Sequence, residues 1–196
     1  NFINEERFAI AYTRGKFNKL IDREISNALL GKEAFIKLKM NSISDFKITD
    51  KLYEASNAGV KIQLIIRGIC CLIPGIKGLS ENIEAISIVD NYLEHSRIYI
   101  FANGGNPDVF ISSADFMTRN LDARVEVTCP IYDEGIKKEL IETFEIGWKA
   151  NVKARIHSID LANKYRRRGD EKPFRAQLEM YNYYQKKLDV IAETVK

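Results

Sequence analysis

Apolar residues in the first third of the chain recur at two different spacings. Over Lys16–Leu30 and Asp45–Ala58 they return every three or four positions, which predicts two amphipathic helices, each ending at a glycine. Over Ala34–Met40 and Val60–Ile66 they return at every second position, which predicts half-buried strands. Because short loops join these alternating helices and strands, we predict an α/β fold with a mixed, largely parallel sheet flanked by helices.

The rest of the pattern predicts four more strands and two more helices. The strands are expected at Ile83–Val89, Arg97–Phe101, Val109–Ser113 and Arg124–Cys129, with the middle two paired as a hairpin. Pro130 is expected to end the last strand. Asp133 is a predicted N-cap for a helix that ends near Trp148, and a final helix is expected over Arg175–Ile191.

The composition is that of one globular domain. The chain has 196 residues, of which 45% are hydrophobic, so it can bury a core without disulfides. Its three cysteines form no disulfide framework, and it has neither a signal peptide pattern nor an apolar run of membrane-spanning length. We therefore expect a single domain over residues 1–196 in the reducing cytoplasm. Because the first residue is Asn, we expect the chain to be a piece of a longer protein.

Positive charge gathers in one segment. The chain carries a net charge of +3, but residues 153–175 hold eight Lys or Arg against three Asp or Glu. This excess favours an anionic partner, while the alternative is a solvated basic surface. We expect residues 150–196 to form a basic, helical C-terminal extension that packs on the same domain.

The candidate chemistry lies between Tyr92 and Val127. His95 opens this stretch, and an imidazole can exchange a proton near neutral pH or attack phosphorus. Either role on a phosphate requires nearby cations. The structural alternative is that His95 only hydrogen-bonds to Glu94 or to a backbone carbonyl. The candidate cations are Arg67, Arg97, Arg119 and Arg124, and the candidate hydroxyl donors are Ser112 and Ser113.

Other polar residues are interpreted as structural. The glycine-containing loop that starts at Arg67 follows a strand, where α/β folds bind ligands, but it lacks the P-loop pattern. Taken alone it is interpreted as a structural loop, and its neighbourhood shifts the interpretation toward a site. Asp115, Asp122 and Glu126 alternate with arginines, which favours ion pairs over a divalent-metal site. The second histidine, His157, has no polar constellation around it and is expected to be hydrogen-bonded scaffolding.

The spacing of these residues resembles a degenerate phospholipase D motif. The sequence motif of that superfamily is His-x-Lys, followed about a dozen residues later by Gly-Ser-x-Asn. Here Arg97 stands in the Lys position, and Ser112-Ser113-Ala114-Asp115 replaces the second element. Ala102 stands where an Asp would follow. Arginine offers more donors to a phosphate but cannot serve as a proton donor, so phosphate binding is expected without phosphodiester hydrolysis.

Longer stretches resemble one family, the bacterial long-chain polyphosphate kinases, in their C-terminal phospholipase-D-like domain. The matching stretches are LIDREISNA, FIKLKMNSI, LYEASNAGVKIQLIIRGICCLIPG, LSENIEAISIVDNYLEHSRIYIFANGG, VFISSADFMTRNLDARVEV, NVKAR and RRRGDEKPFRAQLEMYNYY. The resemblance implies reversible transfer of the terminal phosphate of ATP to polyphosphate. The transfer would pass through a phosphohistidine in a preceding domain that has no counterpart here.

Further expectations follow from the same resemblance. His95 matches a second histidine that contacts ATP phosphates and assists proton transfer or the transition state, and Arg67 matches an ATP-phosphate contact. Arg97, Ser112 and Ser113 are expected to bind phosphate or polyphosphate, together with Arg119 and Arg124. Mg²⁺ is expected to arrive with ATP and to be ligated outside these residues. ADP, the other domains and further copies in a homo-oligomer are the expected partners, and nucleic acid is not. The isolated chain is expected to be inactive, and its location cytoplasmic or peripheral to the inner membrane.

Two alternatives remain at this point. One is a phospholipase-D-like phosphodiesterase or nuclease half-site, in which each chain of a symmetric dimer gives one histidine. The other is a non-catalytic module whose basic segment holds polyanions. Binding of polyanions by such a module would depend on the salt concentration and on the length of the polyanion, and it would not require His95.

Overall fold

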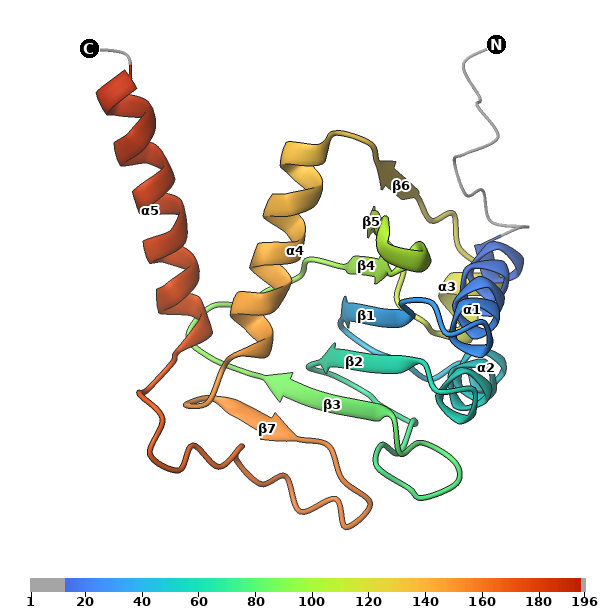
Figure 1. Cartoon of the computed structure of the whole chain (residues 1–196). Coiled ribbons are helices and arrows are strands. Elements are labelled where there is room, and N and C mark those ends of the chain that lie inside the picture. Colours follow the sequence, from blue (N-terminus) through green and yellow to red (C-terminus); the bar gives the residue numbers. More distant parts are fainter. Residues whose placement is uncertain (1–12, 195–196) are drawn as a thin grey trace.

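A seven-stranded sheet forms the centre of the molecule (Figure 1). The computed structural model describes residues 13–194. The strands lie side by side in the order β6-β5-β4-β1-β2-β3-β7. Their bounds are β1 Phe35–Met40, β2 Lys61–Ile66, β3 Ile83–Ile88, β4 Ile98–Phe101, β5 Asp108–Ser112, β6 Thr128–Ile131 and β7 Ala154–Ile156.

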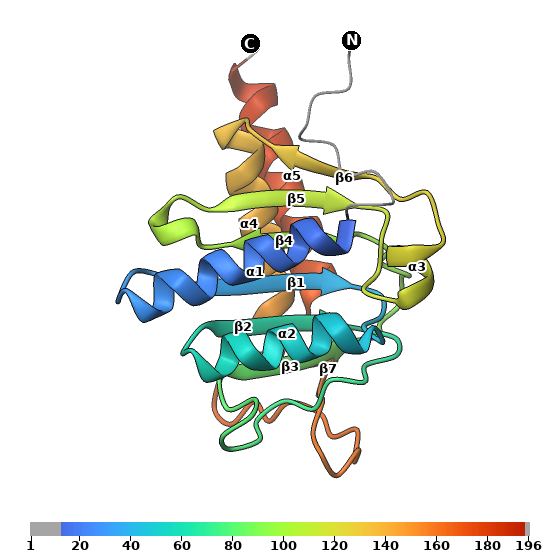
Figure 2. The ribbon, with the colours of Figure 1, turned by 90° about the vertical axis from the view of Figure 1, so that its right-hand side faces the viewer.

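Helices cover both faces of the sheet. Their bounds are α1 Thr13–Leu29, α2 Phe46–Asn57, α3 Thr118–Asp122, α4 Glu134–Trp148 and α5 Ala176–Thr194, and a short 3₁₀ turn, η2, spans Asn103–Gly105. Helices α1 and α2 lie across one face (Figure 2), whereas α4 lies on the other and α5 stands outside α4 (Figure 1). The predicted N-cap Asp133 is confirmed, because its side chain accepts from the N–H of Ile136, and Asp45 caps α2 in the same way by accepting from that of Ile48.

Each face of the sheet has its own apolar core. Under α1, the rings of Phe17, Tyr99 and Phe116 lie with centroids 4.9–5.2 Å apart, and all three side chains are fully buried. Under α4, Phe144 and Trp148 pack against the opposite face. Since both faces are covered, the central strands are buried on both sides.

The predicted mixed sheet flanked by helices is confirmed, but the expectation that it is largely parallel is wrong. Among the described strands, β1, β2 and β3 pair in parallel, while the other four pairings are antiparallel. The chain leaves β3 through residues 89–97 without a helix, returns beside β1 in the opposite direction and continues as the predicted β4–β5 hairpin. The βαβ inference therefore holds only for the first part of the chain.

Two strand predictions need further correction. Residues 124–127 are not in a strand, and Pro130 lies inside β6 rather than ending it. A proline lacks the N–H that a central strand would need, but β6 is an edge strand and tolerates it. A further strand, β7, pairs with β3. Its three residues are too few to produce a visible alternation, which is why the pattern did not predict it.

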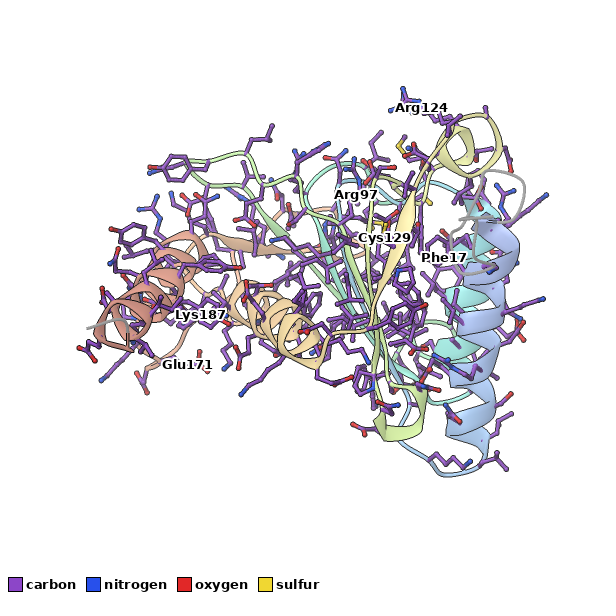
Figure 3. The ribbon with its side chains drawn as sticks, turned by 90° about the horizontal axis from the view of Figure 1, so that it is seen from above. Phe17, Arg97, Arg124, Cys129, Glu171 and Lys187 are labelled. Atoms are coloured by element: carbon purple, nitrogen blue, oxygen red, sulfur yellow. The ribbon has the colours of Figure 1, made fainter. Side chains whose placement is uncertain are left out.

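The C-terminal segment contributes both to the sheet and to the helical layer. Strand β7 forms the edge next to β3, and α5 runs along α4. Tyr183 donates a 2.6 Å hydrogen bond to Glu142, and Lys187 forms an ion pair with Glu139, which holds the two helices together (Figure 3 labels Lys187). Within residues 13–194, no helix has the length and hydropathy that crossing a membrane requires.

Candidate functional site

The candidate residues meet at one end of the central strands. Strands β1 and β2 run in parallel, so the loops that follow Met40 and Ile66 leave at the same edge. Strand β4 runs the other way, so its first residue, Ile98, pairs with Lys39 near the end of β1. This topology brings together the loop after β2, the segment before β4 and the turn after β5.

The loops after β1 and β2 are joined by backbone hydrogen bonds. Gly68 donates to the carbonyl of Asn41 at 2.7 Å, and Ile43 donates to Ile69 at 2.8 Å. A Cβ atom at Gly68 would lie 2.7 Å from the Ser42 hydroxyl and 2.9 Å from the Asn41 carbonyl. Because backbone atoms cannot move aside, this position requires glycine. The backbone next to Arg67 is therefore fixed against its neighbour.

His95 lies between two guanidinium groups. A terminal nitrogen of Arg67 is 2.8 Å from Nδ1 of His95, and one of Arg97 is 3.1 Å from Nε2. Arginine only donates hydrogen bonds, whereas a neutral imidazole has one acceptor nitrogen. His95 therefore cannot accept from both arginines at once. At least one guanidinium keeps an unsatisfied donor beside the ring, in a position that suits an anion.

A buried carboxylate holds Arg97 in place. The Nε atom of Arg97 lies 3.0 Å from one oxygen of Asp115, and a terminal nitrogen lies 3.2 Å from the other. Asp115 is only 5% exposed and also accepts from the backbone N–H groups of Asn41 and Ser42, at 2.9 and 3.3 Å. This fork geometry orients the guanidinium, which leaves its remaining donors pointed toward His95.

Arg67 has a different environment. It is partly exposed, and its guanidinium contacts His95 but forms no ion pair within residues 13–194. Its positive charge is therefore not balanced by a carboxylate in that part of the chain. Arg67 and Arg97 together place two cations around one imidazole, and only Arg97 is neutralised by a near neighbour.

The sequence left open that His95 only hydrogen-bonds to Glu94. In the structure, the Glu94 carboxylate has other partners and does not bind the imidazole. One carboxylate oxygen of Glu94 accepts from Lys39, and the other accepts from Gln177 at 3.2 Å. Lys39 was not singled out from the sequence because its position in an alternating strand indicated an exposed side chain. It is in fact only 8% exposed.

Ser112 and Ser113 bind to the chain itself. The Ser112 hydroxyl lies 2.8 Å from that of Thr128, and Ser113 donates to the Glu126 carboxylate. Ser113 also accepts from the N–H of Val127 at 3.0 Å. These contacts tie the turn after β5 to the segment that leads into β6. The hydroxyls are next to Asp115 in sequence, but their described partners are scaffold residues.

Arg119 and Arg124 lie further from the imidazole. Both are exposed, and neither contacts His95 within the described residues. Figure 3 shows Arg124 on the loop after α3, at the same end of the molecule as Arg97 but apart from it. The structure thus brings Arg67, His95 and Arg97 together and leaves Arg119 and Arg124 outside this cluster.

His157 has a structural role, as expected, but it lies close to the site. Its Nε2 atom is 3.0 Å from the carbonyl of Ile66, the residue before Arg67. Its backbone N–H donates to Ala85 in β3. The two contacts tie β2 and β3 to the segment after β7.

The part of the chain that the structure describes gathers no three His, Cys, Asp or Glu side chains in a way that could hold a metal ion. The carboxylates closest to His95 already have partners. Asp115 binds Arg97, and Glu94 binds Lys39. The site is therefore built from cations and one imidazole, which suits phosphate oxygens directly.

Comparison with known proteins gives one consistent family. The model of "Polyphosphate kinase C-terminal domain 2" matches residues 8–177. The polyphosphate kinase of Vibrio vulnificus strain YJ016 is 49% identical over 171 residues, which are 87% of this chain and 24% of that protein. The enzyme of Escherichia coli K12 is 48% identical over 165 residues, 84% of this chain and 24% of its own length. The chain thus spans about a quarter of the length of these curated relatives.

Solved structures agree with this match. The crystal structure of polyphosphate kinase from Porphyromonas gingivalis superimposes with a TM-score of 0.91 and 45% identity, covering 95% of this chain and 29% of that one. NucT from Helicobacter pylori superimposes with a TM-score of 0.50 at 15% identity, covering 71% of this chain and 91% of NucT. The second likeness concerns the fold alone.

Proposed function

The chain belongs to the polyphosphate kinase C-terminal domain family, and on this premise we propose that it supplies one part of a kinase active site. In this proposal the reaction moves the terminal phosphate of ATP to polyphosphate, reversibly. The part supplied here is His95 with Arg67 and Arg97. The phosphate acceptor that forms the covalent intermediate would be a histidine outside these 196 residues.

The placement of two guanidiniums around His95 is the observation that carries this proposal. In phosphoryl transfer, the bond from the terminal phosphorus to the bridging oxygen of ATP breaks while the bond to the acceptor forms. Negative charge then spreads over the three other oxygens of the transferred group and onto the departing ADP. Arg67 and Arg97 are positioned to balance that charge without changing their own protonation.

His95 would complement the arginines through its proton. An arginine cannot release a proton in a protein, but an imidazole can. Once phosphate oxygens occupy the guanidinium donors, a ring nitrogen of His95 is free to donate a hydrogen bond to the leaving or attacking oxygen. This assigns transition-state stabilisation and proton transfer to His95, and it leaves covalent catalysis to the other domain.

Two further assignments follow from the charges. Arg119, in α3, and Arg124, on the loop after it, are exposed cations and would extend phosphate binding beyond the imidazole. The carboxylates beside His95 are paired with cations, so they do not fit a divalent metal ion. We therefore propose that any Mg²⁺ enters with ATP and is ligated by groups outside this chain.

Autonomous phosphodiester hydrolysis is disfavoured by the Arg97–Asp115 pair. Phosphodiester hydrolysis needs a group that protonates the leaving oxygen, and Arg97, which stands beside the histidine, cannot serve as one. Both carboxylate oxygens of Asp115 are already bound to Arg97. The pair therefore supports phosphate binding in preference to hydrolysis.

The test combines this chain with the remainder of the enzyme. The chain is mixed with radiolabelled ATP alone and then with the complementary part of polyphosphate kinase, and acid-labile protein phosphate and polymer are measured. We expect no labelling of the chain alone and polymer formation on mixing. Acid-labile phosphate on the chain alone would make His95 the nucleophile and overturn the assigned role.

A substitution completes this test. In the whole enzyme, His95→Ala should lower kcat for polymer synthesis by about a hundredfold or more, because general acid–base assistance of that size is lost. The circular dichroism spectrum should not change, since His95 is exposed and lies outside both cores. Polymer synthesis at a rate close to that of the unmodified enzyme would remove His95 from the mechanism.

A further inference from the structure

The segment that leads into His95 has no regular secondary structure. Residues 89–97 connect β3 to β4 without forming a helix or a strand. Apart from the Arg97 carbonyl, which accepts from the N–H of Ser112 at 3.1 Å, no backbone ladder within residues 13–194 holds this segment, so its conformation depends on individual side-chain contacts. Any group that binds this segment therefore also determines where the His95 imidazole lies.

The residue before α5 binds one end of this segment. Arg175 donates from Nε to one oxygen of Asp90 at 2.8 Å and from a terminal nitrogen to the other at 2.6 Å. The Asp90 side chain is fully covered, with 0% exposure. A two-bond fork on a covered carboxylate fixes both the distance and the direction between its partners. The beginning of the His95 segment is thereby fixed to the start of α5.

Gln177, in the first turn of α5, binds the middle of the same segment. Its side-chain oxygen accepts from the N–H of Tyr92 at 3.0 Å, and its side-chain nitrogen donates to the Tyr92 carbonyl at 2.7 Å. The same nitrogen lies 3.2 Å from the Glu94 carboxylate, next to His95. A single amide thus binds both backbone groups of Tyr92, as a neighbouring strand would.

These contacts converge on alternate positions of one segment. Asp90, Tyr92 and Glu94 each have a partner at position 175 or 177, which lie 83 to 85 positions further along the chain. Glu94 is also bound by Lys39 of β1, which connects the segment to the centre of the sheet. The segment is therefore held between β1 on one side and the start of α5 on the other.

We propose that Arg175 and Gln177 are positioning residues for His95. They do not contact the imidazole but hold the backbone that carries it. This inference rests on the proposed function of His95. It also gives the C-terminal extension a task that does not depend on its net charge, because the extension supplies the contacts that complete the site.

The expected kinetic effect follows from this arrangement. A displacement of about 1 Å in a catalytic group can lower a rate by about a hundredfold, even when the change lies outside the chemistry. If the contacts to residues 90–94 are lost, the imidazole should sample several positions while Arg67 stays in place on its own loop. We therefore expect kcat to fall by about tenfold or more and KM for ATP to change less than about threefold.

A direct test measures the imidazoles themselves. The chain has only two histidines, His95 and His157, so ¹⁵N-labelled histidine gives two sets of ring signals. We expect Gln177→Ala to shift or broaden the His95 signals and to leave those of His157 unchanged. Arg168→Ala is the matched control, because Arg168 is an exposed cation of the same extension. It should change neither set.

Variants of Arg175 must not leave the Asp90 carboxylate as an unpaired charge. Arg175→Ala leaves a covered carboxylate without its partner and could destabilise the fold. The Asp90→Ala, Arg175→Ala double variant removes both charges, and Arg175→Lys keeps the charge but offers a single group in place of the fork. We expect displaced His95 signals in the double variant and an intermediate effect for Arg175→Lys.

The same variants in the whole enzyme separate the two proposals. Unchanged His95 signals and unchanged kcat in Gln177→Ala and in the double variant would overturn the positioning role. Displaced His95 signals with unchanged kcat would show that the position set by Arg175 and Gln177 does not matter for catalysis, which would also overturn the proposal. If His95→Ala itself leaves polymer synthesis intact, the proposed function fails, while the ring signals still report whether Gln177 positions the imidazole.

Discussion

A guanidinium nitrogen of Arg67 lies 2.8 Å from Nδ1 of His95, although 28 positions separate the two residues along the chain. Arg67 follows β2, and His95 precedes β4, on the two sides of β1 in the sheet. Neither loop forms the contact by itself. The contact exists because β1 pairs with both strands, so that the end of β2 and the start of β4 lie near each other.

Replacing Arg67 should mainly weaken nucleotide binding. Its guanidinium forms no ion pair in residues 13–194. Removing it therefore leaves no buried carboxylate there without a partner, and the fold should persist. A charge-assisted hydrogen bond contributes about 1.5–3 kcal/mol, so Arg67→Ala in the whole enzyme should raise KM for ATP by about tenfold to a hundredfold. Arg67→Lys should recover part of this effect because it keeps the charge. Steady-state kinetics would refute the assignment if KM and kcat for ATP stayed unchanged.

Asp115 should contribute to stability as well as to the site. It is buried and holds Arg97 together with two backbone N–H groups. Asp115→Ala leaves these donors without a partner and should lower the free energy of unfolding by about 3 kcal/mol. Urea denaturation measures this change. Asp170→Ala, at an exposed carboxylate, is the control and should stay within about 0.5 kcal/mol. Equal midpoints for the two variants would contradict the proposed anchoring of Arg97.

Asp45 should make the stability of the chain depend on acid pH. Burial by itself would raise the pKa of Asp45, but hydrogen bonds from Arg14, the Ile48 N–H and Thr118 outweigh it and hold this pKa below its ordinary value. The stabilisation is thus complete at neutral pH, above the unfolded-state pKa, and is lost as the pH falls through the folded-state pKa.

The matching variant is Asp45→Asn, which can still cap α2 but carries no charge. At pH 7 it should lower the free energy of unfolding by about 1–2 kcal/mol, and this difference should shrink as the pH falls below the unfolded-state pKa of Asp45 and disappear below its lowered folded-state pKa. Asp133→Asn is the control, because Asp133 caps α4 at an exposed position and forms no ion pair within the described residues. A pH-independent difference for Asp45→Asn would show that the charge is not responsible.

The local elements could be predicted from the sequence because each has a strong short-range signal. The alternation in β1 and β2, the helical spacing in α1 and α2 and the capping residue Asp133 all depend on neighbours in the chain. The proximity of His95 and Arg97 in sequence likewise made that pair visible. In these cases local sequence and global fold agree.

The remaining features depend on partners that are distant in the chain. Arg175 and Asp90 are separated by 85 positions, and no local pattern links them. Ser112 and Ser113 have the composition of a phosphate site, but Thr128 and Glu126 bind their hydroxyls. Periodicity shows which residues are in a strand but not which strand lies beside it, and for this reason the direction of β4 was not foreseen.

The two edges of the sheet also affect how the protein behaves at high concentration. At one edge, Pro130 in β6 lacks the N–H that an added strand would require, and at the other, β7 has only three residues. Long, regular edges invite a neighbouring molecule to continue the sheet, whereas interrupted or short ones do not. The chain should therefore resist aggregation through its sheet, even though its two cores are rich in β-branched residues.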